Sequence, residues 1–383
     1  MLVAGPIGLV VLQSTGFCNI DCAYCYLPDR ANPRQTMELS TVGEVARLIF
    51  DSRLLKHDLD IVWHAGEPLT LSPDYYAQAI GIIERRRSQG VDVHYGIQTN
   101  ATLIDDNWID LFERHAISVG VSLDGPRDLH DRNRKYRNGA GSHDRAVAGI
   151  AKLQARGYPF HFIGVVTTPS LSRGAELVDY YQRFGPTAIG LNIEELEAHN
   201  TRSALYDNCD RTTFERFIGD VLLEAARPGD TPVVLRDFQR TLSSLLAGTP
   251  EDNDQVIPLR ILNVAHNGDI STFSPELLAL EAGQRQRFIF GNVHQCAALP
   301  DILSDARFVS AYREISQGVK NCAGACEYFQ YCGGGAPVNK LSETGSLQAT
   351  ETTFCAFTKK AWVDVCLRLA NAQGNQFEVS LTL

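Results

Sequence analysis

Six short runs of β-forming residues in the first two hundred positions constrain the fold of this chain more than any other feature. Stretches with helical patterns separate them, and this alternation is the signature of a parallel sheet whose strands are joined by crossover helices. The runs occupy residues 9–15, 60–65, 93–99, 117–123, 160–166 and 188–193. Six strands are too few for a closed eight-stranded barrel. Because ligands of α/β folds bind at the carboxyl ends of the strands, we expect the functional site there.

Composition indicates an ordinary soluble protein with room for two domains. The chain has 383 residues, of which 44% are hydrophobic and 21% are charged,. It contains no run of eighteen apolar residues, so we expect no membrane span. The formal net charge of -10 gives no support to nucleic-acid binding, which usually requires a basic face,. Ten cysteines without an export signal favour metal ligation over disulfides, and we expect a cytoplasmic protein,.

Three closely spaced cysteines follow the first predicted strand. Cys18, Cys22 and Cys25 form a CxxxCxxC triplet, and the next cysteine is Cys209. An iron-sulfur cluster normally takes four cysteine ligands, so three would leave one iron of a four-iron cluster open to another ligand. A zinc site is the alternative, but zinc sites usually show two CxxC-like pairs or a mixture of cysteine and histidine.

A second group of cysteines lies near the C-terminus. Its four members are Cys322, Cys326, Cys332 and Cys355. Four cysteines can close a full iron-sulfur cluster, and the glycines at 333–335 let the backbone approach its sulfides closely. Zinc is again the alternative, although a zinc ribbon would need two CxxC knuckles. The other cysteines have no partner at ligand spacing and are interpreted as unligated thiols: Cys209, Cys296 and Cys366.

The first triplet has an aromatic residue, Tyr24, before its last cysteine, and in this form it resembles the radical SAM superfamily. The resemblance implies a partial (β/α)6 barrel and a 4Fe-4S cluster held by three cysteines. It also implies that S-adenosylmethionine (SAM) binds the open iron and is cleaved to a 5'-deoxyadenosyl radical, which takes a hydrogen atom from the substrate. An electron donor such as a flavodoxin or ferredoxin would reduce the cluster.

The same resemblance assigns residues that contact SAM. The run WHAGEPL resembles the family's GGEP motif with Ala65 in place of the first glycine, and Ala65, Gly66 and Glu67 would hold the methionyl amino group. Ser122 and Arg134 keep the offset of two further contacts, and a guanidinium suits the methionyl carboxylate,. The remaining expected contacts are Tyr24, Gln98, Asn100 and Asp124. The alternative is that the GEP and Asp-Gly sequences serve only their turns.

The C-terminal part resembles the SPASM extension of radical SAM enzymes, which in full form carries two auxiliary clusters. The four C-terminal cysteines match the outer cluster. Ala336 stands where an inner-cluster ligand is expected, and the segment 264–278 carries no cysteine. We therefore predict one auxiliary 4Fe-4S cluster. The expected organisation is a radical SAM core over 1–200, a bridging region over 201–260 and a SPASM-like domain over 261–383.

The combined motifs FCNIDCAYCYLPDR, FSPELL, GNV, CxYFxxCGGGxPxNK and ETxxC most resemble the cyclophane-forming peptide maturases. Those enzymes modify ribosomally made peptides by joining an aromatic carbon to the β-carbon of the second residue downstream. Thioether formation, epimerisation and sulfatase-type formylglycine formation are the enzymatic alternatives, and the full sulfatase-maturase pattern would have both auxiliary clusters. An iron-sulfur electron carrier or sensor is the non-enzymatic alternative, but it would need no SAM-contacting residues.

Cyclophane chemistry requires the ring radical to lose one electron and one proton. An auxiliary cluster could take the electron, and carboxylates or a histidine could take the proton. By position, the candidate bases are Glu276, Asp269 and His266, and Glu194 and Glu195 end the sixth predicted strand.

No separate peptide-binding domain is apparent ahead of the first strand, so we expect the precursor peptide to dock on the core itself, with the closing run 377–383 as a candidate edge strand,. The alternative is that this run covers the protein's own sheet.

Overall fold

A curved ten-stranded sheet organises the computed structural model, which describes residues 4–28, 30–32, 35–227, 233–247, 252–280 and 282–372. The strand order is β12-β11-β10-β1-β3-β4-β5-β7-β8-β9. Its six central strands are all parallel and correspond to the six predicted runs. They are β1 (Ile7–Leu12), β3 (Leu55–Trp63), β4 (Asp92–Thr99), β5 (Ser118–Ser122), β7 (Phe160–Val166) and β8 (Ala188–Ile193).

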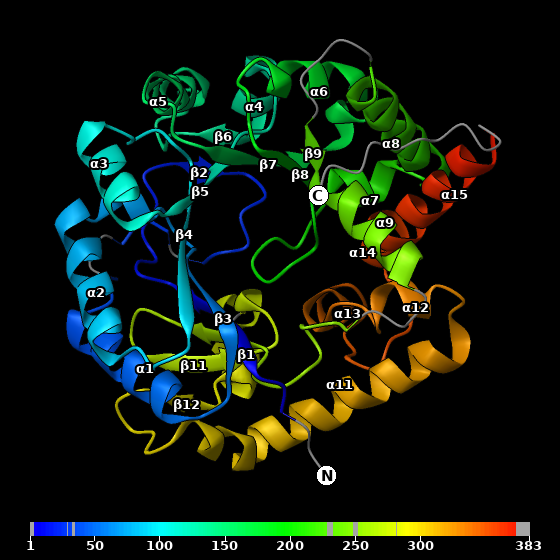
Figure 1. Ribbon diagram of the computed structural model, residues 1–383. Helices are drawn as coiled ribbons and strands as arrows, with labels where there is room; N and C mark the ends of the chain where they lie inside the picture. Colours follow the sequence, from blue (N-terminus) through cyan, green and yellow to red (C-terminus); the bar gives the residue numbers. More distant parts are fainter. Residues whose placement is uncertain are drawn as a thin grey trace.

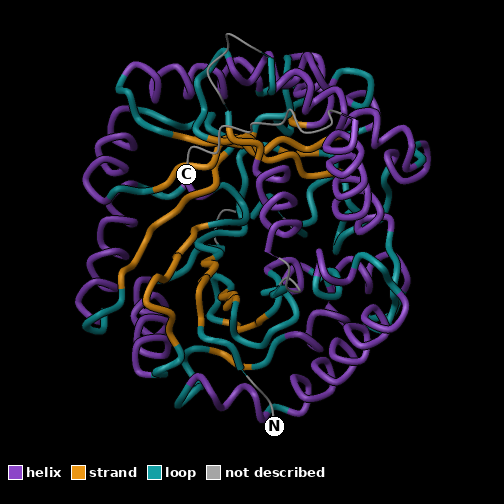
Figure 2. Tube along the Cα trace, turned by 45° about the vertical axis from the view of Figure 1, so that its right-hand side comes forward, coloured by secondary structure: helices purple, strands orange, loops and turns teal. Residues whose placement is uncertain are grey.

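Helices cover the convex side of this sheet, as Figures 1 and 2 show. They are α1 (Leu39–Asp51), α2 (Pro73–Arg86), α3 (Asp106–His115), α4 (Arg127–Asn133), α5 (His143–Ala155) and α6 (Gly174–Gln182). Alternate strand residues pack against them: Trp63 is fully buried, stacks on Tyr95 at 5.6 Å and meets the ring edge of Tyr76 at 5.1 Å. Side chains alternate along a strand, so Asp60 on β3 and His94 on β4, which are paired across the sheet, face the concave side,. The predicted partial barrel is confirmed.

The C-terminal region begins by extending the same sheet. Strand β10 (Ile261–Val264) pairs in parallel with β1, and β11 (Asp269–Thr272) and β12 (Gly291–Asn292) continue from it as antiparallel strands. At the other end, β9 (Val234–Leu235) pairs with β8. The boundaries proposed at residues 200 and 260 stay predictions, and the run 377–383 lies outside the described residues.

The later helices lie between the two ends of the sheet and complete a ring (Figure 1). They are α7 (Ala204–Asn208), α8 (Arg211–Ala225), α9 (Arg236–Ala247), α10 (Ala282–Arg285), α11 (Ala306–Ala325), α12 (Phe329–Cys332), α13 (Pro337–Thr344), α14 (Thr353–Cys355) and α15 (Trp362–Ala372). Helix α11 is held to the sheet through Phe308, which lies 6.2 Å from Phe273 and 5.4 Å from Phe290 between ring centroids. Among the residues that the structure describes, no helix has both the length and the apolar composition needed to cross a membrane.

Candidate functional site

The first cysteine triplet lies in the loop that follows β1, at the carboxyl edge of the sheet. Within this loop, the short strand β2 (Asp21–Cys22) pairs with β6 (Arg134–Lys135), which sets Cys22 opposite Arg134. Arg134 Nη1 lies 4.0 Å from Cys22 Sγ, and Asn100 Nδ2 lies 3.9 Å from Cys18 Sγ. Burial raises the pKa of Cys22 to about 12 and that of Cys18 further, and the charges of Cys22 and Cys25 add to the rise at Cys18. The three thiols are half-buried and lie close together in this loop.

The spacing of the thiols fits a cluster better than a single metal ion. One zinc ion binds sulfur at about 2.3 Å, so any two of its sulfur ligands lie within about 4.6 Å of each other. Within the described residues, only His57, Asp58 and Asp92 bring three ligand atoms within 4.8 Å of one another. Neither cysteine group is that compact. A four-iron cluster binds each thiolate at a different iron and so accepts the wider spacing.

The turn after β3 is pressed against the thiol loop. Gly66 has a φ of 60°, and a Cβ at this position would lie 2.5 Å from the carbonyl oxygens of Thr15 and Phe17. Only glycine fits so close to another backbone segment. Ala65 has a φ of 79°, a left-handed conformation that an alanine rarely adopts,. The glycine that the GGEP motif places here would adopt this conformation without strain.

Glu67 ties the ends of β3 and β4 together. Its side chain is 1% exposed and accepts hydrogen bonds from the Thr99 hydroxyl at 2.7 Å, the Asn100 backbone N–H at 2.7 Å and the Leu69 backbone N–H at 3.0 Å. Burial raises its pKa to about 7, against the effect of these three donors. Oε1 already accepts two of these hydrogen bonds, whereas Oε2 accepts only the Asn100 N–H and can accept one more, which leaves room for a ligand amine,.

Asp124 is the centre of a second buried network. It forms an ion pair with Arg134 Nε at 3.0 Å, accepts the Val165 backbone N–H at 3.0 Å and accepts the Tyr24 hydroxyl. The Arg134 guanidinium also lies 5.5 Å from the centre of the Tyr24 ring. These contacts orient the guanidinium so that Arg134 Nη1 points toward Cys22 Sγ.

Gln98 and Ser122 lie on the concave side of the sheet, where the Gln98 amide donates to the Ser122 hydroxyl at 2.8 Å. The predicted SAM contacts thus lie at the carboxyl ends of β3, β4 and β5 and at the start of β6, and two of them, Asn100 and Arg134, reach the thiols.

Three glutamates form an acidic group beside the thiol loop: Glu195, Glu197 and Glu276. Burial raises the pKa of Glu195 to about 8, and Glu276 adds to this rise. Burial also raises the pKa of Glu276, and burial together with the charges of Glu195 and Glu276 raises that of Glu197. Cys25 contributes to the rise at Glu197, which places the group next to the thiols. All three side chains keep part of their surface exposed, so the group is both desolvated and reachable.

One neighbour contacts the acidic group directly, and a Tyr–His pair lies close to it. The Asn339 amide on α13 donates to Glu195 Oε2 at 2.6 Å. Tyr26 follows Cys25, and its hydroxyl lies 3.2 Å from His64 Nε2. Burial raises the pKa of Tyr26 and lowers that of His64 to about 4, so His64 is neutral at physiological pH. Glu276 Oε2 is buried without a hydrogen-bond partner among the described residues.

The other predicted bases do not join this group. Asp269 pairs with Arg285 at 3.4 Å and accepts the amides of Asn267 and Asn292. His266 lies in the same turn between β10 and β11, and burial lowers its pKa. Glu194 Oε2 accepts from the Ser203 hydroxyl and the Leu205 N–H, so it fixes the loop after β8.

The four C-terminal cysteines also come together. Cys322 lies in the last turn of α11, and Cys326 directly follows that helix. Cys332 is the last residue of α12, and Cys355 is the last residue of α14. Burial raises the pKa of Cys332, while the backbone N–H groups of Gly334 and Gly335 lower it and Cys322 raises it. Gly333, Gly334 and Gly335 all have positive φ, between 60° and 109°. This turn presents N–H donors toward sulfur, as the glycine run predicts.

The remaining cysteines join neither set of thiols, and Ala336 offers no ligand atom. Ala336 is 5% exposed and precedes α13. The Sγ atoms of Cys209 and Cys296 contact backbone oxygens of their own loops, at 3.2 and 3.0 Å. Cys366 is buried on α15. In the described part of the chain, we find no additional cysteine positioned to hold an inner cluster.

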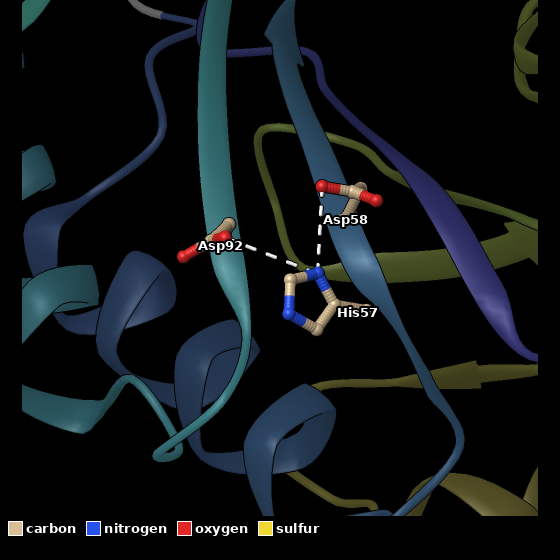
Figure 3. A group of neighbouring side chains, drawn as sticks. All are labelled: His57, Asp58 and Asp92. Carbon is tan, nitrogen blue, oxygen red and sulfur yellow. Dashed lines mark ion pairs between the residues drawn. The ribbon is translucent and has the colours of Figure 1, made fainter.

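Two features lie at the opposite, amino edge of the sheet. His57, Asp58 and Asp92 form the ion pairs drawn in Figure 3, and their side chains are 63–74% exposed. A pocket of about 470 Å³ lies beside the starts of β5 and β7, where Ser118 and His161 line it. Neither feature includes a thiol or a predicted SAM contact, and exposed ion pairs of this kind contribute little.

Comparison with known proteins identifies the family of this fold and site. The sequence profile of the radical SAM superfamily matches residues 12–180. An uncharacterized protein of Synechocystis sp. is 35% identical over 358 residues, which are 92% of this chain and 89% of that protein. The chain belongs to the radical SAM superfamily. A serine-type anaerobic sulfatase-maturating enzyme of Klebsiella aerogenes is 31% identical over 163 residues, 42% of this chain and 40% of that enzyme.

Two solved structures share the fold over most of the chain. Native anSMEcpe with bound AdoMet has a TM-score of 0.76 and 18% identity, and the match covers 97% of this chain and all of that one. SuiB of Streptococcus suis bound to its precursor peptide SuiA has a TM-score of 0.65 and 16% identity, and the match covers 92% and 76% of the two chains. At these identities the likeness concerns the fold.

Membership of the radical SAM superfamily implies a SAM-binding 4Fe-4S cluster, and the thiol loop fits one. Sequence reasoning missed several neighbours of this site. His64 directly precedes Ala65, a predicted SAM contact. Glu197 lies two residues after Glu195, a candidate base, in the same loop. Asn339 and Lys340 lie within the quoted PxNK motif, but the motif alone predicts a role for neither.

Proposed function

We propose that this chain is a radical SAM maturase that forms a cyclophane in a ribosomally made peptide, joining an aromatic carbon to the Cβ of the second residue downstream. The observation that carries the proposal is the acidic group, because it brings desolvated carboxylates from the loop after β8 and from the C-terminal region next to the thiol loop. A crosslink by hydrogen abstraction needs a base at the place where the radical reacts.

The chain's own residues have distinct tasks in this proposal. When bound, SAM and its cluster supply the 5'-deoxyadenosyl radical. Cys18, Cys22 and Cys25 would hold that cluster, and Arg134 would orient the methionyl carboxylate. Asp124 positions Arg134 through their 3.0 Å ion pair rather than contacting SAM itself. Ser122, Gln98 and the turn at 65–67 would complete the binding of SAM.

Glu276 is the best-supported proton acceptor. Its buried Oε2 has no hydrogen-bond partner among the described residues, and burial raises its pKa. A base whose pKa lies closer to the operating pH is more effective than an ordinary surface carboxylate. Asp269 and His266 are less suited, because Asp269 is engaged by Arg285 at the start of β11 and His266 lies in the turn just before it.

The auxiliary cysteines would take part in the oxidation step. After the new C–C bond forms, the aromatic ring carries an unpaired electron and an extra proton. Glu276 would accept the proton, and an auxiliary cluster held by the four C-terminal cysteines would supply the one-electron oxidation that restores the aromatic ring.

Formylglycine formation is the second candidate, and the similarity to sulfatase-maturating enzymes favours it. Ala336 counts against it, because the full sulfatase-maturase pattern would carry an inner-cluster cysteine there. Both candidates remove two hydrogens when the target is serine, so mass alone cannot separate them.

The decisive experiment is mass spectrometry of the peptide encoded beside the gene, after anaerobic incubation with reconstituted enzyme, reductant and SAM. A cyclophane gives a loss of two hydrogens, suppressed fragmentation between an aromatic residue and its second downstream neighbour, and no reaction with a hydrazide. Capture by the hydrazide would instead identify an aldehyde and favour formylglycine. Unchanged mass with deuterium uptake would indicate epimerisation, and loss of an alkylatable thiol would indicate a thioether.

Two variants separate the roles of the two clusters. Cys22→Ala should abolish formation of 5'-deoxyadenosine, because it removes a ligand of the SAM-binding cluster. Cys332→Ala should retain part of that cleavage and lose the crosslink. Full product formation by Cys332→Ala would exclude the auxiliary centre as the electron acceptor.

A further inference from the structure

A buried lysine lies against the C-terminal thiols. Lys340, on α13, is 4% exposed, and its ammonium group donates to Cys322 Sγ at 3.2 Å and to the Gly318 carbonyl at 3.3 Å. Gly335 packs beside its aliphatic stem, since even a Cβ there would lie only 3.4 Å from Lys340 Cε. The turn that carries the N–H donors and the lysine that faces the thiols are therefore packed together.

This ammonium has no carboxylate partner among the residues that the structure describes. The contrast is with Lys360, also close to the thiols, which pairs with Glu351 at 2.7 Å and contacts the face of Tyr328. Glu343 is one turn from Lys340 on α13, but its oxygens accept from Thr353 and Phe354. A buried charge without a counter-charge is costly, so Lys340 requires negative charge on the sulfur side of its environment.

We propose that Lys340 is a positioning residue that acts through Cys322 to make the auxiliary centre a better electron acceptor. The proposal rests on the proposed function, in which that centre oxidises the ring radical. In that step the cluster held by Cys322 and the other three thiols would take one electron from the ring, which would make its total charge more negative by one. The Lys340 ammonium lies beside this added charge and would stabilise it, and the hydrogen bond to sulfur acts in the same direction,.

The same helix links this centre to the acidic group. Asn339, the residue before Lys340, holds Glu195 through the 2.6 Å hydrogen bond. Helix α13 thus contacts both the electron acceptor and the carboxylates, while Glu343 caps the helix that carries Cys355. Replacing Lys340 changes the charge on the side of α13 that faces the thiols and leaves the side chains of Asn339 and Glu343 in place.

The test is a redox titration of the reconstituted full-length enzyme, followed by electron paramagnetic resonance. Lys340→Met removes the charge and keeps most of the volume, and Lys340→Arg keeps the charge. Lys320→Met is the matched control, because Lys320 lies on α11 and is exposed, where solvent screens its charge,. Iron content verifies that both clusters are present in each variant.

We expect Lys340→Met to make reduction of the auxiliary centre at least tenfold less favourable, which is about 59 mV for a one-electron couple. Lys340→Arg and Lys320→Met should stay near the wild type, and the SAM-binding cluster should not shift in any variant. An auxiliary cluster that assembles in Lys340→Arg but not in Lys340→Met would also support a requirement for charge.

An unchanged potential in a fully loaded Lys340→Met enzyme would overturn the proposal, as would equal loss of the cluster in both variants. The potential is measured without peptide, so its outcome is independent of whether the product is a cyclophane.

Discussion

Replacing Asp124 by asparagine removes the negative charge that faces Arg134 while keeping the shape of the side chain. The two groups lie 3.0 Å apart, and their side chains are 3% and 9% exposed. At an effective dielectric constant of about 20, two unit charges at this distance attract each other by roughly 5.5 kcal/mol. The desolvation of both groups offsets part of this attraction, and removing one partner of a buried pair costs about 3–5 kcal/mol.

Thermal unfolding of the apo protein tests this value. Unfolding entropy is about 2.1 cal/mol/K per residue, or about 0.8 kcal/mol/K for this chain, so we expect Asp124→Asn to lower Tm by about 4–6 °C. Asp128→Asn is the matched control, because Asp128 pairs with Arg173 on the surface and is 64% exposed. Such a pair contributes at most about 1 kcal/mol, which is about 1 °C. Equal shifts in the two variants would refute the reasoning.

Three further predictions follow from single positions. Gly334 has a φ of 109°, and a Cβ there would lie 2.9 Å from the Val319 side chain, so Gly334→Ala should lose the auxiliary cluster and reduce iron from about eight to about four per chain,. Gly324→Ala, with nothing within 4 Å of the new Cβ, should keep all of it, and equal iron loss would contradict the steric argument. Ala65→Gly should raise Tm by about 1 °C, because it relieves the φ of 79° at a cost in chain entropy; a lower Tm would show that no strain is stored there,. Burial raises the pKa of Glu195 from 4.5 to about 8, so the folded protein keeps a proton that the unfolded chain releases, and stability should fall as pH rises from about 5 to 8,. Tm measured across this range should fall less for Glu195→Gln, and parallel curves would exclude Glu195 as the source.

Local patterns were enough to predict the six central strands and the residues at their carboxyl ends. Phe160–Val166 and Ala188–Ile193 match the predicted runs residue for residue, because strands buried in a parallel sheet need continuous apolar sequence,. Local patterns could not predict that β10 pairs with β1. This pairing joins residues about 250 positions apart, and a four-residue strand carries no signal of its partner.

The acidic group could also be predicted only in part from the sequence. Glu276 and Glu195 could be chosen by position, but their meeting with Glu197 depends on how the loop after β8 and the C-terminal region fold against each other. In the sequence, Lys340 is only the last residue of the PxNK motif. Its importance depends on burial and on the 3.2 Å contact with Cys322, which no spacing rule predicts.

The parallel pairing of β10 with β1 limits how this protein can be recombined with its relatives. A chimera joined near residue 260 would have to supply a new strand in register with Leu9–Leu12, or the backbone groups along that edge of β1 would be left without partners,. Exchange of C-terminal regions between related enzymes is therefore a matter of matching strand registers. The workable crossover points are those that keep β1 and β10 from the same parent.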